Sequence, residues 1–268
     1  MMRIIIYELR KEFIILLAYP IEIVFWTISP LLWVVPLIFQ GKALIGGLQS
    51  TAFGNLAGTG EYIPYVLIGA IFSTYMFSAI WYMGNSLRNE MFYGTLEQIL
   101  SAPVKPIILL IGKGLYGSIL STLFVAAQVL ICVFIFGLDI TFAKILPMLF
   151  FLMLLIVGLY GVGFIAAAVT LLIKEAHGVL HLFEYVLFLF SPIRYPVEVH
   201  PVTRAISVFI PLTYALIALR GILLGIEFDF WKNGLFLLGV DCAIIPLGIV
   251  IFNAIERRTK RRGTLAHY

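Results

Sequence analysis

Three side chains that could carry out chemistry lie within one apolar segment: His177, His181 and Glu184. Spacings of four and three residues place them on one face of a helix. Such a face can bind a metal ion, relay protons or form a hydrogen-bonded structural cluster. A metal ion would need a third or fourth ligand from elsewhere, and no Cys or His obviously supplies one. We therefore expect a structural cluster and no metal.

Other ionisable groups in apolar stretches are Glu22, Lys113 and Asp241. An unpaired charge in lipid costs several kcal/mol, so such groups usually face a cavity or a partner. We place these three near the ends of predicted membrane spans. There, snorkelling to the interface or pairing at it accounts for them.

These groups keep two further function classes open. An ion-coupled secondary transporter would use Glu184, His181 or Asp241 as its coupling-ion site, and it would often show inverted repeats, which this sequence lacks. A membrane enzyme would need convergent polar groups at one depth, which only the face with His177 offers.

The elements that position these groups are membrane helices. Of the 268 residues, 62% are hydrophobic and 12% charged, and the mean hydropathy is +1.07, more than a soluble core requires. We predict an all-α polytopic integral membrane protein with one domain over residues 1–268. The net charge of +4 sits at span ends, which excludes nucleic-acid binding. Cys132 and Cys242 lie in apolar stretches and read as buried hydrophobes.

Six spans are predicted. The first, residues 21–39, has 19 residues or about 28 Å of helix, close to the hydrocarbon thickness. Before it, residues 3–20 fit either a helix lying along the inner surface or an ordinary positive flank. The other spans lie at 62–82, within 107–136, within 145–173, from 178 to 190, and at 234–252.

The segment 191–225 cannot form one straight span, because Pro192, Pro196, Pro201 and Pro211 interrupt it. Backbone breaks at membrane depth are tolerated only where protein or water covers them. We predict two short re-entrant helices on the external side.

The distribution of basic residues predicts the orientation. Twelve of the 18 Lys and Arg residues fall on one side of the predicted spans: eleven in the N-terminus, the 85–106 loop, the 174–177 turn and the 254–268 tail, and Lys113 near the start of the third span. Cytoplasmic segments carry such an excess. We expect both termini in the cytoplasm of a multi-pass protein of the cell membrane.

The polar loop 85–106 is the segment most informative about function. Residues 94–103 read as a short helix that Thr95 caps and Pro103 stops, with Leu96, Ile99 and Leu100 as an apolar stripe. No phosphate-binding Gly-x-x-x-x-Gly-Lys-Ser/Thr motif occurs in the sequence, so this chain alone should hydrolyse no nucleotide. The stripe either packs on its own bundle or, as we favour, docks on a partner.

Four motifs then carry a resemblance. Tyr93-Gly-Thr-Leu-Glu97 with Leu100-Ser-Ala-Pro103 follows the second span, and Ser191-Pro-Ile-Arg-Tyr-Pro196, Pro211-Leu-Thr-Tyr-Ala215 and Leu219-Arg-Gly221 precede the sixth. In this order the chain resembles the permease subunit of type 2 ATP-binding-cassette (ABC) transporters, over nearly its whole length.

The resemblance implies a transporter of two permease chains, in a homodimer or a similar pair, and two cytoplasmic ATPase chains. ATP and Mg would sit on the ATPases, and this chain would bind no cofactor. Export of an apolar or amphiphilic drug, lipid or glycolipid is implied. A coupling helix at the ATPase would include Tyr93, Gly94, Thr95, Leu96, Glu97, Leu100 and Pro103. The external re-entrant helices would include Pro192, Tyr195, Pro196, Pro211, Leu212, Thr213, Tyr214 and Arg220.

Overall fold

The computed structural model describes residues 2–45, 51–92, 94–95, 98–99, 105–136, 141–173 and 176–262. The regular elements in these ranges are helices, as predicted. In chain order they are α1 (Met2–Ala18), α2 (Pro20–Ile45), α3 (Thr51–Ala57), α4 (Tyr62–Ser78), the π-helix η1 (Ala79–Met83), α5 (Gly84–Phe92), α7 (Pro106–Phe136), α8 (Phe142–Leu172), α9 (Ala176–Phe190), the 3-10 helix η2 (Val197–Val199), α10 (Pro201–Ser207), α11 (Pro211–Leu224) and α12 (Phe230–Arg262).

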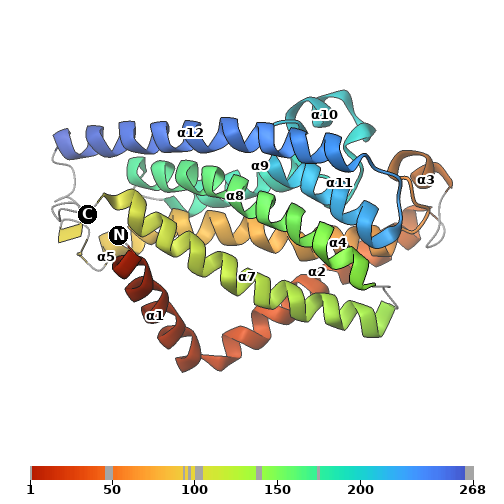
Figure 1. Cartoon of the computed structure of the whole chain (residues 1–268), viewed down its shortest axis with the longest axis horizontal. Coiled ribbons are helices and arrows are strands. Elements are labelled where there is room, and N and C mark those ends of the chain that lie inside the picture. Colours follow the sequence, from red (N-terminus) through yellow and green to blue (C-terminus); the bar gives the residue numbers. More distant parts are fainter. Residues whose placement is uncertain are drawn as a thin grey trace.

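Four long apolar helices run along the long axis of the molecule (Figure 1). Each is long and apolar enough to cross a membrane, and the number rises to six if each of two bent helix pairs counts as one span. The all-α polytopic prediction is therefore confirmed. The four helices are Tyr62–Phe92, Pro106–Phe134, Phe142–Leu172 and Phe230–Arg261.

The two other predicted spans correspond to α2 and α9. Residues 21–39 lie inside α2, whose 26 residues give about 39 Å of helix. The fifth span lies in α9, whose 15 residues give only about 22 Å, shorter than the hydrocarbon core. The chain leaves α9 at Ser191, where the sequence predicted the break.

A sharp elbow separates α1 from α2. The segments Leu9–Ala18 and Pro20–Ser29 meet at 91° around Tyr19. Pro20 takes the first position of α2, where its missing N–H costs nothing, and it disfavours helical backbone at Tyr19. Leu16 is buried in a cluster with Tyr116 and Leu120 of α7, so α1 packs against α7.

The helix of the second span is longer than predicted. We expected a loop from residue 85, but Tyr62–Phe92 is one continuous helical segment. The prediction failed because Asn85, Arg88 and Glu90 make the sequence polar there, while Leu87 is fully buried in a cluster that includes Phe164 of α8. Tertiary packing therefore extends the helix beyond its apolar run.

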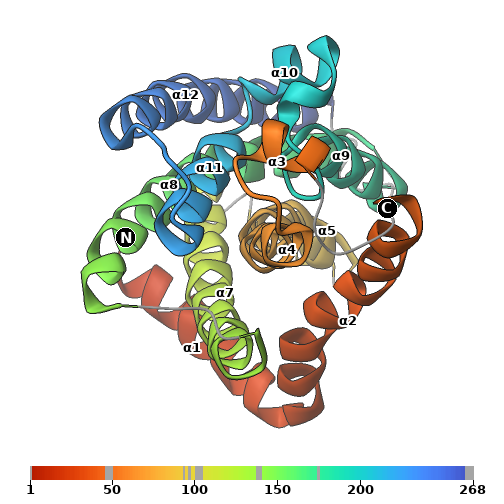
Figure 2. The ribbon, with the colours of Figure 1, turned by 90° about the vertical axis from the view of Figure 1, so that its right-hand side faces the viewer.

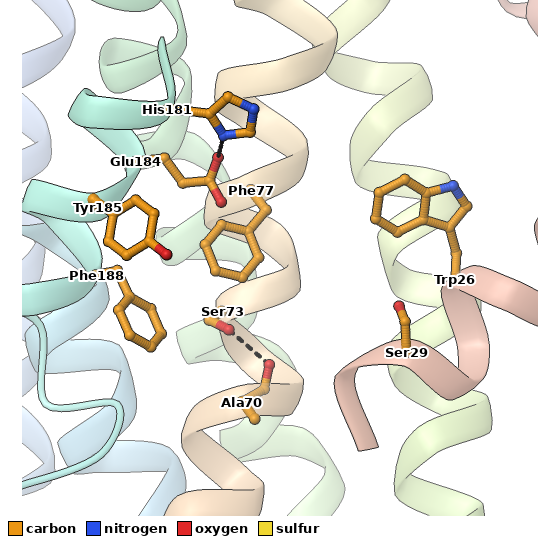
Figure 3. A pocket seen from close by; sticks show the side chains of 9 residues that line it. All are labelled: Trp26, Ser29, Ala70, Ser73, Phe77, His181, Glu184, Tyr185 and Phe188. Carbon is orange, nitrogen blue, oxygen red and sulfur yellow. Dashed lines mark hydrogen bonds and ion pairs between the residues drawn. The ribbon is translucent and has the colours of Figure 1, made fainter. Parts of the chain in front are cut away.

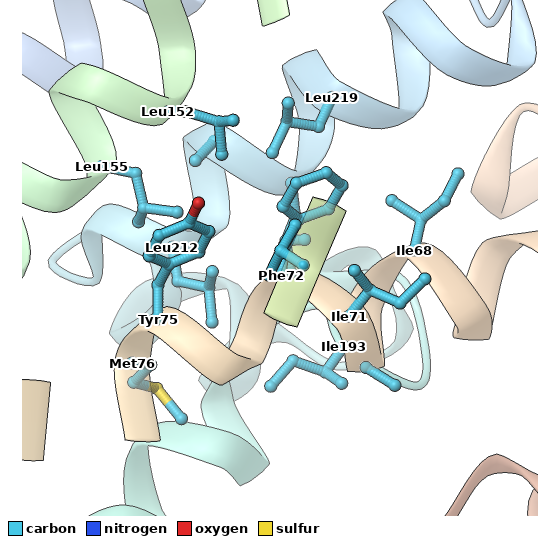
Figure 4. Packing of buried hydrophobic residues seen from close by; sticks show 14 of the residues in the cluster. Ile68, Ile71, Phe72, Tyr75, Met76, Leu152, Leu155, Ile193, Leu212 and Leu219 are labelled. Atoms are coloured by element: carbon cyan, nitrogen blue, oxygen red, sulfur yellow. The ribbon is translucent and has the colours of Figure 1, made fainter. Parts of the chain in front are cut away.

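Figure 2, a view along the bundle, places α4 in the middle of the other helices. In the most apolar window of this helix 72% of residues are buried, against 22% for α12, which leaves α12 with an apolar outer surface. The main core forms around α4, where Phe72 and Ile68 meet Leu155 of α8 and Leu212 and Leu219 of α11 (Figure 4). Whatever moves α4 therefore moves the core.

Close backbone contact joins α8 to α12. A Cβ at Gly161 would lie 2.8 Å from the carbonyl oxygen of Ile244, and one at Gly248 would lie 2.5 Å from that of Gly161. Small residues allow helix backbones to approach in this way in membranes, where dispersion contacts replace the hydrophobic effect.

Candidate coupling end, outer closure and central cavity

One end of the bundle gathers the start of α1, the end of α5 and the end of α12 (Figure 1). We call it the coupling end. At this end α5 is closed by Gly94, whose φ of +68° favours glycine. The Gly94 N–H donates to the Met91 carbonyl at 3.1 Å, and the Thr95 N–H donates to the Glu90 carbonyl at 2.9 Å. This pair of bonds is a helix C-cap that turns the chain into the predicted coupling helix.

Glu90 links the coupling segment to α1. It is only 9% exposed, and its carboxylate accepts a hydrogen bond from the Thr95 hydroxyl. Lys11 of α1 lies 3.8 Å from its other carboxylate oxygen. The sequence analysis did not select Glu90. The usable signal was a carboxylate five residues before a Thr that directly follows a helix-ending Gly.

The structure describes only part of the predicted coupling helix. The Thr95 carbonyl accepts the Ile99 N–H at 3.1 Å, the first bond of a helical turn, and Gln98 and Ile99 are helical. Tyr93, Leu96, Glu97, Leu100 and Pro103 lie outside the described residues.

A buried ion pair is a second link between α1 and the bundle. Lys113 of α7 is 8% exposed and donates to the Glu12 carboxylate of α1. The predicted pairing of Lys113 is therefore found, and its partner is Glu12 of α1. Glu22, by contrast, is exposed in the first turn of α2.

The opposite end of the bundle carries α3, α10 and α11 (Figure 1). Two short helices lie there, at the place where the re-entrant pair was predicted: Pro201–Ser207 and Pro211–Leu224 meet at 99°, an angle that fits a re-entrant pair or a broken span. Pro211 begins α11 at the position where a proline loses no hydrogen bond.

Arg220 joins three segments at this end, and we call the arrangement the Arg220 clamp. The guanidinium is 3% exposed and donates to the Tyr65 carbonyl from Nε and Nη2, at 3.1 and 2.9 Å. It also donates to the carbonyls of Pro192 and Ile193. Its Cζ lies 3.4 Å from the centroid of the Tyr65 ring, a cation–π contact.

Gly69 makes room for the clamp. A Cβ there would overlap the Ile193 carbonyl oxygen and would lie 2.6 Å from Nη2 of Arg220. The turn after α9 therefore sits directly on α4. Neither Tyr65 nor Gly69 was among the residues predicted for the site. Every residue has a backbone carbonyl, and a close approach between two backbone segments cannot be recognised in a single sequence.

The other predicted residues of this end pack around the clamp. Tyr195 donates from its hydroxyl to the Leu189 carbonyl, and Tyr214 stacks on Phe236 of α12 with ring centroids 5.6 Å apart. The buried members of the set are Pro192, Pro196, Pro211, Leu212 and Thr213. Five of the eight thus lie in α11 and three in the turn after α9, and Arg220 makes the most polar contacts.

A cavity of about 370 Å³ lies between α2, α4 and α9. We call it the central cavity. Figure 3 shows α4 and α9 on one side and α2 on the other. Its lining is aromatic or small apart from one acid and one histidine, and consists of Trp26, Ser29, Ala70, Ser73, Phe77, His181, Glu184, Tyr185 and Phe188.

The three predicted side chains of α9 come together at this cavity around a fourth, Trp81. Its indole N–H donates to Glu184 Oε2 at 2.7 Å, and Nδ1 of His181 lies 3.5 Å from the same oxygen. The Trp81 ring contacts the rings of His177 and His181 edge to face, with centroids 5.1 and 4.6 Å apart. Trp81 lies in the π-helix η1. The sequence signal that could have identified Trp81 is a Trp inside an apolar run, because its indole N–H needs a hydrogen-bond acceptor when buried.

This arrangement is a hydrogen-bonded aromatic cluster. Within the described part of the chain, no three His, Cys, Asp or Glu side chains converge as a metal ligand set.

Asp241 was misplaced by the sequence prediction. It lies well inside α12 rather than near a span end, and is 4% exposed. Among the described residues neither carboxylate oxygen has a hydrogen-bond partner. A Cβ at Gly158 of α8 would overlap its Oδ1, so Asp241 packs against α8 and is not in the lining of the central cavity.

A family model for the ABC-2 type transporter matches residues 13–224. The chain belongs to the ABC-2 type transporter family. No curated protein matches it. The ABC-2 match runs from within α1 to the end of α11, so it includes Glu90, Gly94 and Thr95 of the coupling end, the central cavity and the Arg220 clamp.

ABC-2 permeases are transmembrane subunits without an ATPase site of their own, and they act with an ABC ATPase subunit. This agrees with the missing phosphate-binding motif.

Proposed function

We propose that this chain is the permease subunit of an ATP-driven exporter of apolar or amphiphilic molecules. An ABC ATPase docks at the coupling end on residues 94–103, and two permease chains and two ATPase chains form the transporter. The substrate path passes the central cavity, and the Arg220 clamp closes its outer end. Both termini and the coupling end face the cytoplasm.

The observation that carries this proposal is the connection of the coupling segment to the bundle. Gly94 and Thr95 are fixed to the end of α5 by two backbone bonds, and Glu90 links Thr95 to Lys11 of α1. A force on the docked helix would therefore be delivered to the segment Tyr62–Phe92 and to α1 together. A loop without these bonds would absorb the motion.

The opposite end supports a closure that moves as a unit. α10 and α11 are short and bent by 99°, and the Arg220 clamp fixes α11 to α4 through backbone oxygens. A displacement of α4 therefore displaces the closure as well.

The second permease chain is proposed on the side where α2 and α9 are open. Large apolar side chains are exposed there, including Val24 and Phe25 of α2 and Leu182, Tyr185 and Leu189 of α9. A second copy would cover both helices and enclose the two central cavities in one path.

The experiment is ATP-dependent transport in membrane vesicles that contain this chain and its ABC ATPase. Inside-out vesicles should accumulate a fluorescent amphiphile when ATP is supplied outside, since their cytoplasmic face is outward. Leu96→Asp or Glu97→Arg should abolish accumulation while insertion and expression are retained. Glu227→Arg, a charge reversal in the exposed segment between α11 and α12, is the control and should transport normally.

Three results would contradict the proposal. The first is normal transport by both coupling-helix variants. The second is ATP-dependent loss of the amphiphile from inside-out vesicles, which means import. The third is transport by the chain without any ATPase, driven by a proton or sodium gradient.

A further inference from the structure

We infer that the central cavity binds lipophilic organic cations, with Glu184 as their counter-ion. The ligand class is a quaternary ammonium, a phosphonium or a protonated amine attached to an aromatic or branched apolar body. This inference rests on the proposed function, because it names the substrate class of the same path.

The carboxylate of Glu184 is held in place at the edge of the cavity. The Trp81 N–H and the His181 Nδ1 both contact one oxygen, Oε2. The second oxygen points away from His181, toward the side of the cavity where Phe77 lies (Figure 3). The side chain is 20% exposed, so the carboxylate is partly removed from water yet still reachable. A carboxylate in this setting gains from a cation that replaces the lost water.

Aromatic rings surround the position that such a cation would take. Phe77 of α4 and Phe188 of α9 stack with centroids 6.2 Å apart, and Trp26 of α2 and Tyr185 of α9 complete the lining. The faces of aromatic rings attract cations, quaternary ammonium groups above all. The same rings pack against the apolar body of an amphiphile.

The charges near the cavity favour a cation over an anion. Of the described lining residues, Glu184 is the one with a formal charge when His181 is neutral. Arg194 is the basic residue next to the lining, and its guanidinium lies 4.5 Å from the centroid of the Phe188 ring. It is not itself part of the lining.

The size of the cavity also limits the ligand. About 370 Å³ is at the lower end of the range for drug-sized ligands. A compact cation of three or four rings matches this volume better than a glycolipid does.

The test uses two probes of equal shape and opposite charge, tetraphenylphosphonium and tetraphenylborate. Binding of radiolabelled tetraphenylphosphonium is measured on the purified complex of this chain with its ATPase, for the wild type and three variants. Glu184→Gln removes the charge and keeps the shape. Glu184→Asp restores the charge on a shorter stem. Glu227→Gln removes an exposed charge far along the chain and serves as the control.

We expect saturable tetraphenylphosphonium binding by the wild type and by Glu227→Gln. Glu184→Gln should bind about tenfold more weakly or worse, the factor expected when a charge-assisted contact is lost. Glu184→Asp should recover part of the affinity, and radiolabelled tetraphenylborate, measured by itself, should show no saturable binding. Equal affinity of Glu184→Gln and wild type for tetraphenylphosphonium would overturn the inference. So would saturable binding of tetraphenylborate, or no saturable binding of tetraphenylphosphonium by the wild type, the result expected if a second copy of the chain fills the cavity.

The two proposals fail in different ways. If binding depends on Glu184 but ATP drives no movement of the cation, the transport proposal is wrong and the cation site stands. If ATP drives export of a neutral amphiphile equally in wild type and Glu184→Gln, and tetraphenylphosphonium binds both alike, the exporter stands and the cation site is wrong.

Discussion

Arg220→Ala is the substitution whose cost follows most directly from the structure. The guanidinium makes four hydrogen bonds to three buried carbonyls, those of Tyr65, Pro192 and Ile193. Alanine would leave all three without this donor. It would also remove the cation–π contact with the Tyr65 ring.

The magnitude can be worked out from these contacts. The Tyr65 carbonyl keeps its place in the hydrogen-bond ladder of α4, which leaves the Pro192 and Ile193 carbonyls as the acceptors without a donor. A buried acceptor left without a donor costs about 1–3 kcal/mol, so the two amount to about 2–6 kcal/mol. A desolvated cation–π contact adds about 1–2 kcal/mol. Relaxation of the turn after α9 recovers part of this, so we expect a loss of about 4 kcal/mol or more, in the range reserved for broken buried networks. Arg220→Lys should lose less stability than Arg220→Ala, because one ammonium group can keep some of these hydrogen bonds. It cannot reach both the Tyr65 carbonyl and those of the turn after α9.

The assay is unfolding of the purified chain in mixed micelles by increasing detergent denaturant, followed by circular dichroism. Proteolysis within residues 191–200 is measured in parallel, since loss of the clamp should free this turn before the bundle unfolds. Arg204→Ala is the control, as Arg204 is exposed on α10, and it should change stability by no more than about 0.5 kcal/mol. If Arg220→Ala unfolds at the same midpoint as Arg204→Ala and is cut no faster, the clamp does not stabilise the outer end.

Two other predictions concern packing and coupling. Gly158→Ala should destabilise the chain by about 1–3 kcal/mol, because the new methyl group would overlap Asp241 Oδ1. In an Asp241→Ala background most of that cost should vanish in the same unfolding assay, and strictly additive losses would contradict the contact. Glu90→Gln should lower the amount of cargo exported per ATP hydrolysed, because the charge that holds Lys11 and Thr95 is lost. An unchanged ratio of transport to hydrolysis in vesicles would show that Glu90 takes no part in coupling.

Sequence patterns predicted the parts of this fold that depend on composition and on proline. Long apolar runs indicated α4, α7, α8 and α12. The break at residues 191–225 was predictable because a proline inside a span has no backbone N–H to donate to the helix. The extension of the second span to Phe92 was harder to predict. It depends on what α5 packs against, which a hydropathy pattern does not contain.

The site was predictable to the extent that its residues are polar in apolar surroundings. His177, His181 and Glu184 were found from their spacing on one helix face. Trp81 was not, because its role depends on an indole N–H meeting an acceptor on a helix more than a hundred residues away in sequence. The partners of Arg220 are backbone carbonyls, which every residue has, so only the fold could select them.

The coupling end, the central cavity and the Arg220 clamp share one helical segment, Tyr62–Phe92. Its start carries the carbonyl that Arg220 binds and the glycine on which the turn after α9 rests. Its middle lines the central cavity and supplies Trp81, and its far end carries Glu90. Because this segment is buried among its neighbours, we expect an axial or rotational displacement at the coupling end to reach the cavity and the clamp.

The π-helix Ala79–Met83 is the one irregular turn in this segment, and it lies between the cavity and the coupling end. Helices bend most readily where the regular hydrogen-bond ladder is interrupted. A bend there would move Trp81, and with it the Glu184 carboxylate that Trp81 holds, relative to the aromatic lining on α4. Energy delivered through Glu90 would then change the cation site before it changes the Arg220 clamp, the order that an exporter needs if its substrate is to be released only after the path is committed outward.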